Sequence, residues 1–207
     1  VTPTAAIPLY GRSADNIRDH RHVTSLLHRI ETTDTGVLVT PTLSFDERGH
    51  QVNHMTYYCV GWSGNGEKPV DFYPTAEDFV GEGGNFERPY AIVKNAEGVK
   101  AGTKIEGLEA VGGLHFSEIT LEPEEECSYL IFTGITEDIQ EIRNLSKTYT
   151  TREKVLEELE KTKAYWQEKV NVAYHTGDSD FNQFMHWVSF QPCLLYTSPS
   201  PRDMRRS

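Results

Sequence analysis

The sequence predicts a mainly β domain that leads into helices. Up to Ile135, segments rich in β-branched and aromatic residues are separated by turns rich in glycine, proline and acidic residues, which is typical of antiparallel strands. After Ile135 the apolar residues recur at the spacing of amphipathic helices. Strands followed by helices, without alternation, favour an all-β domain joined to a helical one.

Composition limits the class of protein. With 207 residues, 37% of them hydrophobic and 11% aromatic, the chain can bury a core of its own. A mean hydropathy of -0.52, with no apolar run near the roughly 18 residues that a spanning helix needs, excludes a membrane protein. The net charge of -11 and the lack of a basic stripe argue against nucleic acid as a partner. Three cysteines without a CxxC pair indicate reduced thiols and a cytoplasmic protein.

The first half is expected to be mostly strands. The expected elements are a strand or loop over Val1–Tyr10, a helix over Asn16–Leu27, and strands over His28–Thr33, Gly36–Phe45, Gln51–Trp62 and Val70–Tyr73. Pro41 marks an edge or a bulge, because proline cannot donate to a sheet ladder. Ser63–Gly66 is typical of a hairpin turn.

The second half changes from strands to helices. We expect a short strand or turn at Tyr90–Asn95, and then a hairpin formed by Leu114–Leu121 and Cys127–Ile135, with the second strand central in its sheet. The expected helices are one capped by Thr136 and Asp138 that runs to about Leu145, one over Thr151–Val170, and one over Phe181–Gln191 capped by Ser179 or Asp180. The third is apolar nearly all round, which is typical of a buried helix.

The stretch Phe72–Pro89, FYPTAEDFVGEGGNFERP, is the most distinctive loop of the sequence. Its glycines allow backbone angles and close approaches that a Cβ would block, and aromatic residues bracket it. It is either a plain surface loop or a loop that docks against another domain, a subunit or a ligand. We favour a domain- or subunit-contact loop formed by Phe79, Gly81, Glu82, Gly83, Gly84 and Phe86. It lacks the Lys-Ser/Thr of a phosphate-binding loop.

Three other groups are candidate chemical sites. A polar cluster suits phosphate or sugar, or is a solvated face with one or two packed histidines; its members are Arg18, Asp19, His20, Arg21, His22, His28 and Arg29. Acidic side chains can form a carboxylate pair or be simply solvated: Glu77, Asp78 and Glu82. Aromatic side chains can stack on a sugar or belong to the core: Tyr57, Tyr58, Trp62 and Tyr73. We predict no catalytic, cofactor-binding or metal-binding residue within this sequence.

The last residues break with what precedes them. An aromatic helical pattern is replaced at Cys193–Asp203 by CLLYTSPSPRD, which resembles the in-frame translation of a transposase sequencing adapter. We therefore interpret residues 193–207 as foreign to the gene, against the alternative of a native Pro/Ser linker. Since the chain starts with Val1 and not Met, we expect it to be a piece of a longer protein, incomplete also at its N-terminus.

Several segments together resemble glycoside hydrolase family 94, formerly glycosyltransferase family 36. They are YGRSADNIRDHRHVTSLLHRI, VTPTLSFDERGHQVN, the distinctive loop and ITLEPEEECSYLIFTGITED; FNQFMHWVSFQP resembles the start of the family's catalytic barrel. The family includes cellobiose and chitobiose phosphorylases and the C-terminal part of cyclic β-1,2-glucan synthases. The resemblance implies an antiparallel β-sandwich of the supersandwich, galactose-mutarotase-like type. A helical linker and the first helix of a truncated (α/α)6 barrel follow it. The implied boundaries are 1–135, 136–177, 178–192 and the foreign tail 193–207.

The resemblance also implies a function. The parent protein is expected to be an inverting glycoside phosphorylase that cleaves β-linked glucooligosaccharides with inorganic phosphate as co-substrate and without a cofactor. The catalytic acid lies in the barrel, so the fragment itself is expected to be inactive. Carbohydrate is the expected partner, through the missing barrel; a homodimer is possible, and a membrane is relevant only for a synthase-type parent. The alternatives are a non-catalytic carbohydrate-binding or structural β-sandwich and an inverting glycoside hydrolase of similar architecture.

Overall fold

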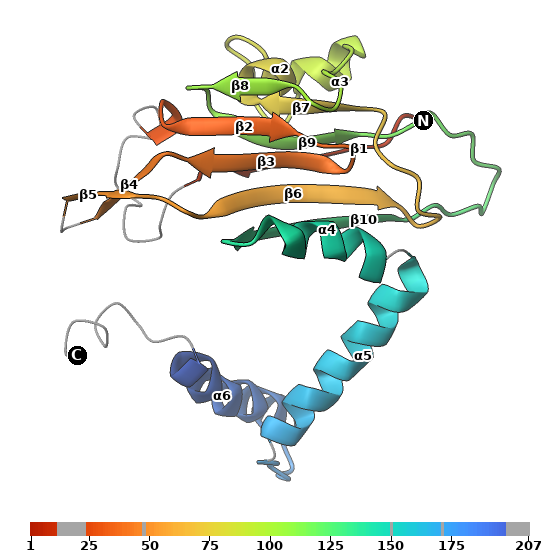
Figure 1. Cartoon of the computed structure of the whole chain (residues 1–207). Helices are drawn as coiled ribbons and strands as arrows, with labels where there is room; N and C mark the ends of the chain where they lie inside the picture. Colours follow the sequence, from red (N-terminus) through yellow and green to blue (C-terminus); the bar gives the residue numbers. More distant parts are fainter. Residues whose placement is uncertain (12–23, 47–48, 150, 171, 198–207) are drawn as a thin grey trace. The chain divides into compact units, whose positions relative to one another are not determined.

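The computed structural model of the protein describes residues 1–11, 24–46, 49–149, 151–170 and 172–197 (Figure 1). The chain forms two compact units, Val1–Lys154 and Val155–Ser207. The first unit is a sandwich of antiparallel sheets, as the sequence predicts. The expected helix over Asn16–Leu27 lies mostly outside the described residues, which include only its last four positions.

The larger sheet of the sandwich, sheet B, has five antiparallel strands in the order β10-β6-β3-β2-β8. Their bounds are Tyr129–Thr136 for β10, Thr56–Ser63 for β6, Gly36–Pro41 for β3, His28–Thr32 for β2 and Lys104–Glu106 for β8. Residues alternate between buried and exposed along β2, which is the pattern of a strand with one face on a core.

The smaller sheet, sheet A, has three antiparallel strands in the order β1-β9-β7. Their bounds are Thr4–Leu9 for β1, Ala110–His115 for β9 and Asp71–Thr75 for β7. Of Val1–Tyr10, expected to be a strand or a loop, Thr4–Leu9 is therefore a strand. β7 is irregular between Tyr73 and Thr75, where Pro74 cannot donate to the ladder.

The core lies between sheets A and B and is made of small, branched and aromatic residues. Val37, Val39 and Cys59 of sheet B meet Phe72 and Leu114 of sheet A, and all five are buried. β9 of sheet A contains two adjacent glycines, Gly112 and Gly113. A Cβ on Gly112 would lie 2.2 Å from the Cβ of Cys59, so the two sheets approach closely where β9 has no side chain.

Two of the expected strands are each divided in the structure. The first divides into β3 and β4 (Leu43–Asp46), and the second into β5 (Gly49–Val52) and β6; β4 and β5 pair as a separate hairpin. Pro41 ends β3, which lies in the interior of sheet B, so of the two alternatives, an edge or a bulge, the edge does not hold. Pro41 has no N–H group to donate, and beyond it Thr42 N–H continues the pairing, by donating to the Leu27 carbonyl at 3.0 Å.

The hairpin expected from residues 114–121 and 127–135 does not form, and the turn expected at Ser63–Gly66 forms but does not join paired strands. Residues 114–121 and 127–135 were expected to pair, but β9 belongs to sheet A and β10 to sheet B. β10 is an edge strand and not a central one; its apolar residues reflect packing on both of its faces. Ser63–Gly66 does turn, with Gly66 N–H donating to the Ser63 carbonyl at 2.8 Å, but it leads from sheet B to sheet A.

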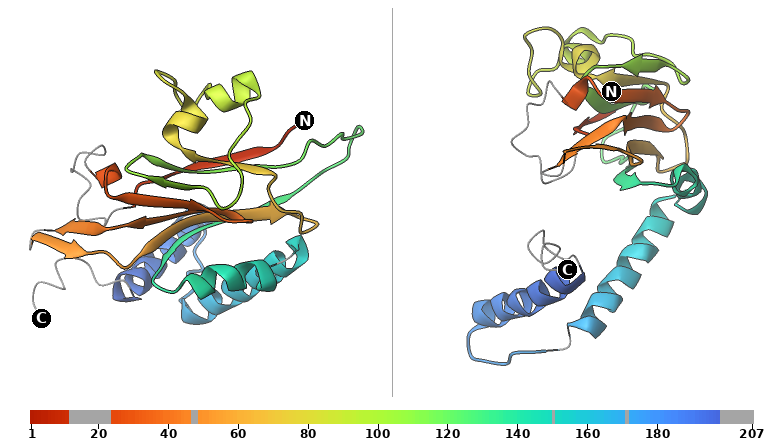
Figure 2. Two further views of the ribbon diagram at one scale, coloured as in Figure 1. Left: turned by 45° about the horizontal axis from the view of Figure 1, so that its top comes forward. Right: turned by 60° about the vertical axis from the view of Figure 1, so that its left-hand side comes forward.

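Helix α4, Ile139–Thr148, packs on the outer face of sheet B (Figure 2). Asp138 caps it by accepting a hydrogen bond from Gln140 N–H at 2.8 Å, as the sequence predicts. Aromatic rings fix its far end: the Trp62 and Phe132 rings stack at 5.1 Å, and Phe132 and Tyr149 at 5.5 Å. The Trp62 indole also donates to the Tyr149 carbonyl at 2.7 Å.

The second unit contains most of α5, Arg152–Lys169, and all of α6, Ser179–Thr197. α5 matches the expected helix within two residues. The cap of α6 differs from the expectation, because Asp178 accepts hydrogen bonds from Asp180 N–H and Phe181 N–H, both at 3.0 Å. The backbone of α6 continues past Pro192 without a break, and the domain boundaries inferred from the resemblance remain a prediction.

Candidate functional site

The distinctive loop begins with a short helix, α2, Ala76–Val80, that the sequence did not predict. Thr75 starts it, accepting a hydrogen bond from Asp78 N–H at 3.1 Å and donating its hydroxyl to the Asp78 carboxylate at 2.7 Å. This is a reciprocal capping arrangement. Asp78 thus serves as a helix cap, whereas Glu77 and Glu82 take no part in this arrangement. The Thr-x-x-Asp spacing was the signal that sequence reasoning missed.

The two aromatic residues of the loop have different roles. Phe79 is 5% exposed and packs with Tyr73, Ala91 and Val111 on the outer face of sheet A, whereas Phe86 is 45% exposed. Their ring centroids are 5.9 Å apart. Phe79 therefore anchors the loop to the sandwich, and Phe86 is available for a contact.

Glycines shape the turn that follows α2. Gly81 has φ of +80°, and a Cβ there would lie 2.6 Å from the Cβ of Tyr90. Gly84 lies against the Val80 carbonyl, which a Cβ would approach to 2.2 Å. Larger residues cannot adopt these positions without displacing the backbone. The loop is thus built on the sandwich, with Glu82, Gly83 and Phe86 exposed at its outer side.

A second short helix, α3, Tyr90–Lys94, follows where a strand or turn was expected. Pro89 precedes it and Asn95, in the left-handed conformation, ends it; these two flanking residues were the available signal. Three apolar side chains of α3 are about half exposed, as is Phe86 of the preceding loop. We call these four exposed apolar residues the α3 patch: Phe86, Tyr90, Ile92 and Val93.

The described part of the polar cluster does not form a binding site. Arg18, Asp19, His20, Arg21 and His22 lie outside the described residues, so that part stays a prediction. His28 is buried, and its two ring nitrogens lie 3.0 Å from the Tyr10 carbonyl and 3.2 Å from the Leu108 carbonyl. Burial lowers its pKa, against the two hydrogen bonds. Arg29 faces the other side of β2 and pairs with Glu106 at 3.3 Å.

The aromatic residues considered for sugar stacking form no exposed platform. Trp62 and Tyr73 are buried in different sheets, and Tyr57 and Tyr58 are successive residues of β6 that point to opposite faces. Their role is packing. Burial raises the pKa of Tyr73 to about 12, and its hydroxyl donates to the Ala96 carbonyl at 2.6 Å.

Sequence reasoning also missed a polar pair between buried Asp71 and the partly buried His115. His115 Nδ1 lies 2.6 Å from the Asp71 carboxylate, and the Tyr73 hydroxyl lies 3.5 Å from the same nitrogen. Gly98 approaches the Asp71 carboxylate closely enough that a Cβ there would lie 2.7 Å from it. Asp71 and Tyr73 of β7 are thus connected to His115 of β9, and Gly98 packs against them. We interpret these contacts as a structural network.

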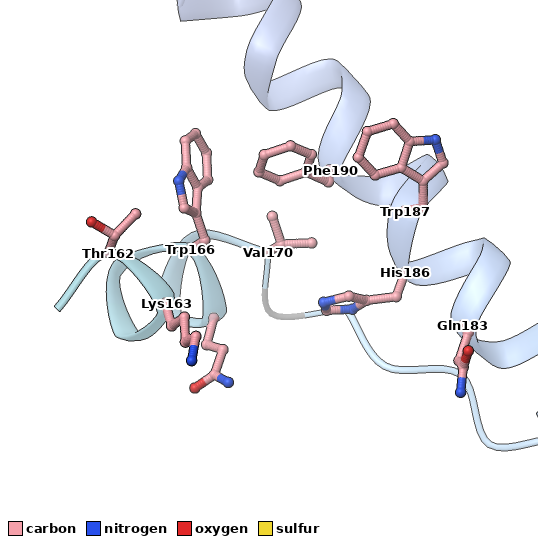
Figure 3. Close-up of a pocket in the computed structure, with 9 residues that line it drawn as sticks. Thr162, Lys163, Trp166, Val170, Gln183, His186, Trp187 and Phe190 are labelled. Carbon is pink, nitrogen blue, oxygen red and sulfur yellow. The ribbon is translucent and has the colours of Figure 1, made fainter. Parts of the chain in front are cut away.

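The second unit holds an apolar groove between its two helices, of about 400 Å³ (Figure 3). Trp166 of α5 and Trp187 and Phe190 of α6 form its walls, with Phe190 edge-on to Trp166 at 4.6 Å. Lys163 and His186 also line it. No group of three or more metal-ligating side chains occurs among the described residues.

The described residues also contain no helix that is long and apolar enough to cross a membrane. No curated protein matches the chain. The family model described as "Glycosyl hydrolase 94, supersandwich domain" matches residues 10–152. This match covers more than half of the chain and ends where the β-sheet unit ends. The chain therefore belongs to glycoside hydrolase family 94 and carries the supersandwich domain of that family.

Proposed function

We propose that this chain is the sandwich part of an inverting glycoside phosphorylase that acts on β-linked glucooligosaccharides. The observation that supports the proposal is the family match over residues 10–152. In the reaction, an oxygen of inorganic phosphate attacks the anomeric carbon from the face opposite the glycosidic bond. That bond breaks, and a carboxylic acid of the enzyme gives its proton to the leaving oxygen. The products are an α-sugar 1-phosphate and a shortened sugar.

The role of this chain in that reaction is to hold a catalytic barrel in place. Asp78, one of the acidic residues of the loop, is used as a helix cap, and no catalytic acid is assigned to this chain. The catalytic acid and the phosphate-binding groups belong to the proposed barrel, and the 207-residue chain by itself is expected to be inactive. Its substrate contact is indirect.

The loop after β7 is the proposed contact to the barrel or to a partner subunit. Phe79 fixes the loop to sheet A, and Gly81, Gly83 and Gly84 set its turn. Glu82 and the exposed α3 patch then face outward on a rigid base. Apolar side chains gathered on a well-anchored loop are typical of a contact surface.

A phosphate-dependence assay with the complete gene product tests the function. The enzyme is incubated with β-linked glucooligosaccharides, with and without inorganic phosphate, and α-glucose 1-phosphate and free glucose are measured. We expect α-glucose 1-phosphate only when phosphate is present, and no turnover by the 207-residue chain. Free sugar released at the same rate without phosphate would identify a hydrolase and contradict the proposal.

A further inference from the structure

The turn over residues 63–66 contains Asn65 followed by Gly66, the only Asn-Gly pair in the sequence. Both residues are exposed to solvent. Asparagine is chemically labile because the backbone nitrogen of the next residue can attack its side-chain carbonyl carbon. A Cβ on that next residue obstructs the attack, and Gly66 has none. The sequence therefore makes Asn65 the most reactive asparagine on steric grounds.

The side chain of Asn65 is also less constrained than those of other asparagines. In the part of the chain that the structure describes, it has no hydrogen-bond partner. Three other asparagine side chains accept backbone hydrogen bonds: Asn53 from Met55 N–H at 2.8 Å, Asn85 from Glu87 and Arg88 N–H at 3.0 Å, and Asn182 from Thr176 N–H at 3.0 Å. Two more are followed by residues with a Cβ: Asn95 by Ala96 and Asn144 by Leu145. Asn65 alone among these six combines a free amide with a following glycine.

One hydrogen bond of the turn restrains the attacking nitrogen. Gly66 N–H donates to the Ser63 carbonyl at 2.8 Å, and Gly66 has φ of +86°, a conformation that glycine adopts without strain. The nitrogen can attack only after this bond has opened, because it must lose the proton that it donates. The turn follows the end of β6 and is exposed, so such an opening requires only a local fluctuation and no unfolding of sheet B.

We propose that Asn65 is a site of spontaneous deamidation, with solvent water as the only co-reactant. The Gly66 nitrogen forms a bond to the side-chain carbonyl carbon of Asn65 and gives up its proton. The bond from that carbon to the amide nitrogen breaks, and the amide nitrogen takes a proton and leaves as ammonia. Water then opens the cyclic imide at either carbonyl group, which leaves aspartate or isoaspartate. Nothing is oxidised or reduced in either step.

The modification alters the connection between the two sheets. In the imide, Gly66 has no N–H, so its hydrogen bond to Ser63 is lost. Isoaspartate lengthens the backbone by a methylene group just before Glu67, whose carbonyl accepts a hydrogen bond from Ser63 N–H at 2.8 Å. Gly64 N–H donates to the Ser128 carbonyl at 2.7 Å and precedes the modified residue, so this bond is kept. Deamidation thus loosens the turn, adds a negative charge to it, and leaves β6 paired with β10.

Ageing of the folded 207-residue chain in mildly alkaline buffer, followed by peptide mapping, tests the site. We expect the amide of Asn65 to be lost at least about tenfold faster than that of Asn85, which is followed by Phe86 and is held by two backbone N–H groups. An isoaspartyl methyltransferase should label the peptide that contains residue 65. Equal rates at Asn65 and Asn85, or an Asn65 amide that stays intact, would overturn the proposal.

Two variants and one change of condition test the mechanism. Asn65→Gln keeps an exposed amide but would need a larger ring, so it should abolish the labelling. Gly66→Ala should slow the loss of the amide by at least about tenfold both in the folded chain and in urea, where strain in the turn plays no part. The unchanged chain should react at least about threefold faster in urea than when folded, because the bond to Ser63 is then open. Labelling that persists in Asn65→Gln, or a rate that Gly66→Ala leaves unchanged, would contradict the proposal. No sugar or phosphate is involved, so its failure would leave the proposed function standing.

Discussion

The sandwich and the helical unit bury their apolar residues to very different extents. In the sandwich, Val37, Val39 and Val60 are completely buried between the two sheets and α4. In the helical unit, no residue of α5 is buried, and on α6 Phe184 is 60% and Trp187 is 55% exposed. The hydrophobic effect acts on both units, but only the sandwich buries a core of apolar side chains through contacts within the unit.

Regular helical structure alone therefore does not show that a segment is stable by itself. α6 has a good cap and several large apolar side chains, yet Phe181, Phe184 and Trp187 remain about half exposed. Exposed aromatic residues of this kind are typical of a contact surface. We therefore expect the sandwich to provide most of the free energy of unfolding of the chain, and helices α5 and α6 to contribute little to it. Substitutions in the sandwich should then lower the stability strongly, whereas those in the helical unit should have little or no effect.

Replacement of a phenylalanine by alanine should show the largest difference between the two units. Phe72 is 2% exposed between the sheets, so we expect Phe72→Ala to lower the free energy of unfolding by about 3–5 kcal/mol. Phe184→Ala, on α6, should change it by less than about 0.5 kcal/mol. Urea unfolding followed by tryptophan fluorescence measures both. A larger loss for Phe184→Ala would reverse the contrast.

Removal of a helix cap should likewise depend on the unit. Thr75→Val deletes the reciprocal bonds to Asp78 at a buried position and should cost about 1–2 kcal/mol. Asp178→Ala deletes the cap of α6 and should reduce helical circular dichroism without a shift of the main melting transition. A common shift in both variants would show that α6 unfolds together with the sandwich.

Acid should destabilise the sandwich through His28. Burial lowers its pKa in the folded state below the unfolded value of about 6.5, so the unfolded chain binds the proton first as the pH falls. Stability should therefore decrease as the pH drops from about 6.5 to the folded pKa, with a slope of at most about 1.4 kcal/mol per pH unit. Urea midpoints measured across this range should lose that slope in His28→Gln. His175→Gln, at an exposed position of the helical unit, should keep it.

The ion pairs of α5 should matter least. Lys161 lies 3.0 Å from Glu157 and 2.7 Å from Glu158, and the two carboxylates raise its pKa to about 12, but the ammonium is fully exposed. Water and salt screen such pairs. Lys161→Ala should leave the unfolding midpoint within experimental error at low and at high salt. A clear salt-dependent loss would mean that α5 contributes to the cooperative unit.

The sequence was sufficient for those features that local pattern determines. The alternation in His28–Thr32, the Asp138 cap and the span of α5 were all predictable, because each depends on residues that are neighbours in the chain. The family was also recognisable, and the match over residues 10–152 confirms it. Among the candidate contact residues, Phe79 is buried and anchors the loop, a role that depends on its packing against sheet A and not on the local sequence.

Strand pairing and the α3 patch were not predictable in the same way. β10 has the apolar content of a central strand but lies at an edge, because α4 covers one face and Trp62 and Tyr149 stack with Phe132. β9 pairs with β1 across a long separation in the chain, which no local pattern encodes. Ile92 and Val93 favour a strand by their β-branched side chains, but Pro89 and Asn95 set a helix instead.

Amide hydrogen exchange of the 207-residue chain tests the contrast between the units most directly. β3, β6 and β9 form the interior of the sandwich, so their amides should exchange only through global unfolding. Amides of α6 should exchange faster by several orders of magnitude, through local opening that leaves the sandwich folded. Amides of α6 that exchange as slowly as those of β3 would show a self-sufficient helical unit and contradict the contrast between the two units.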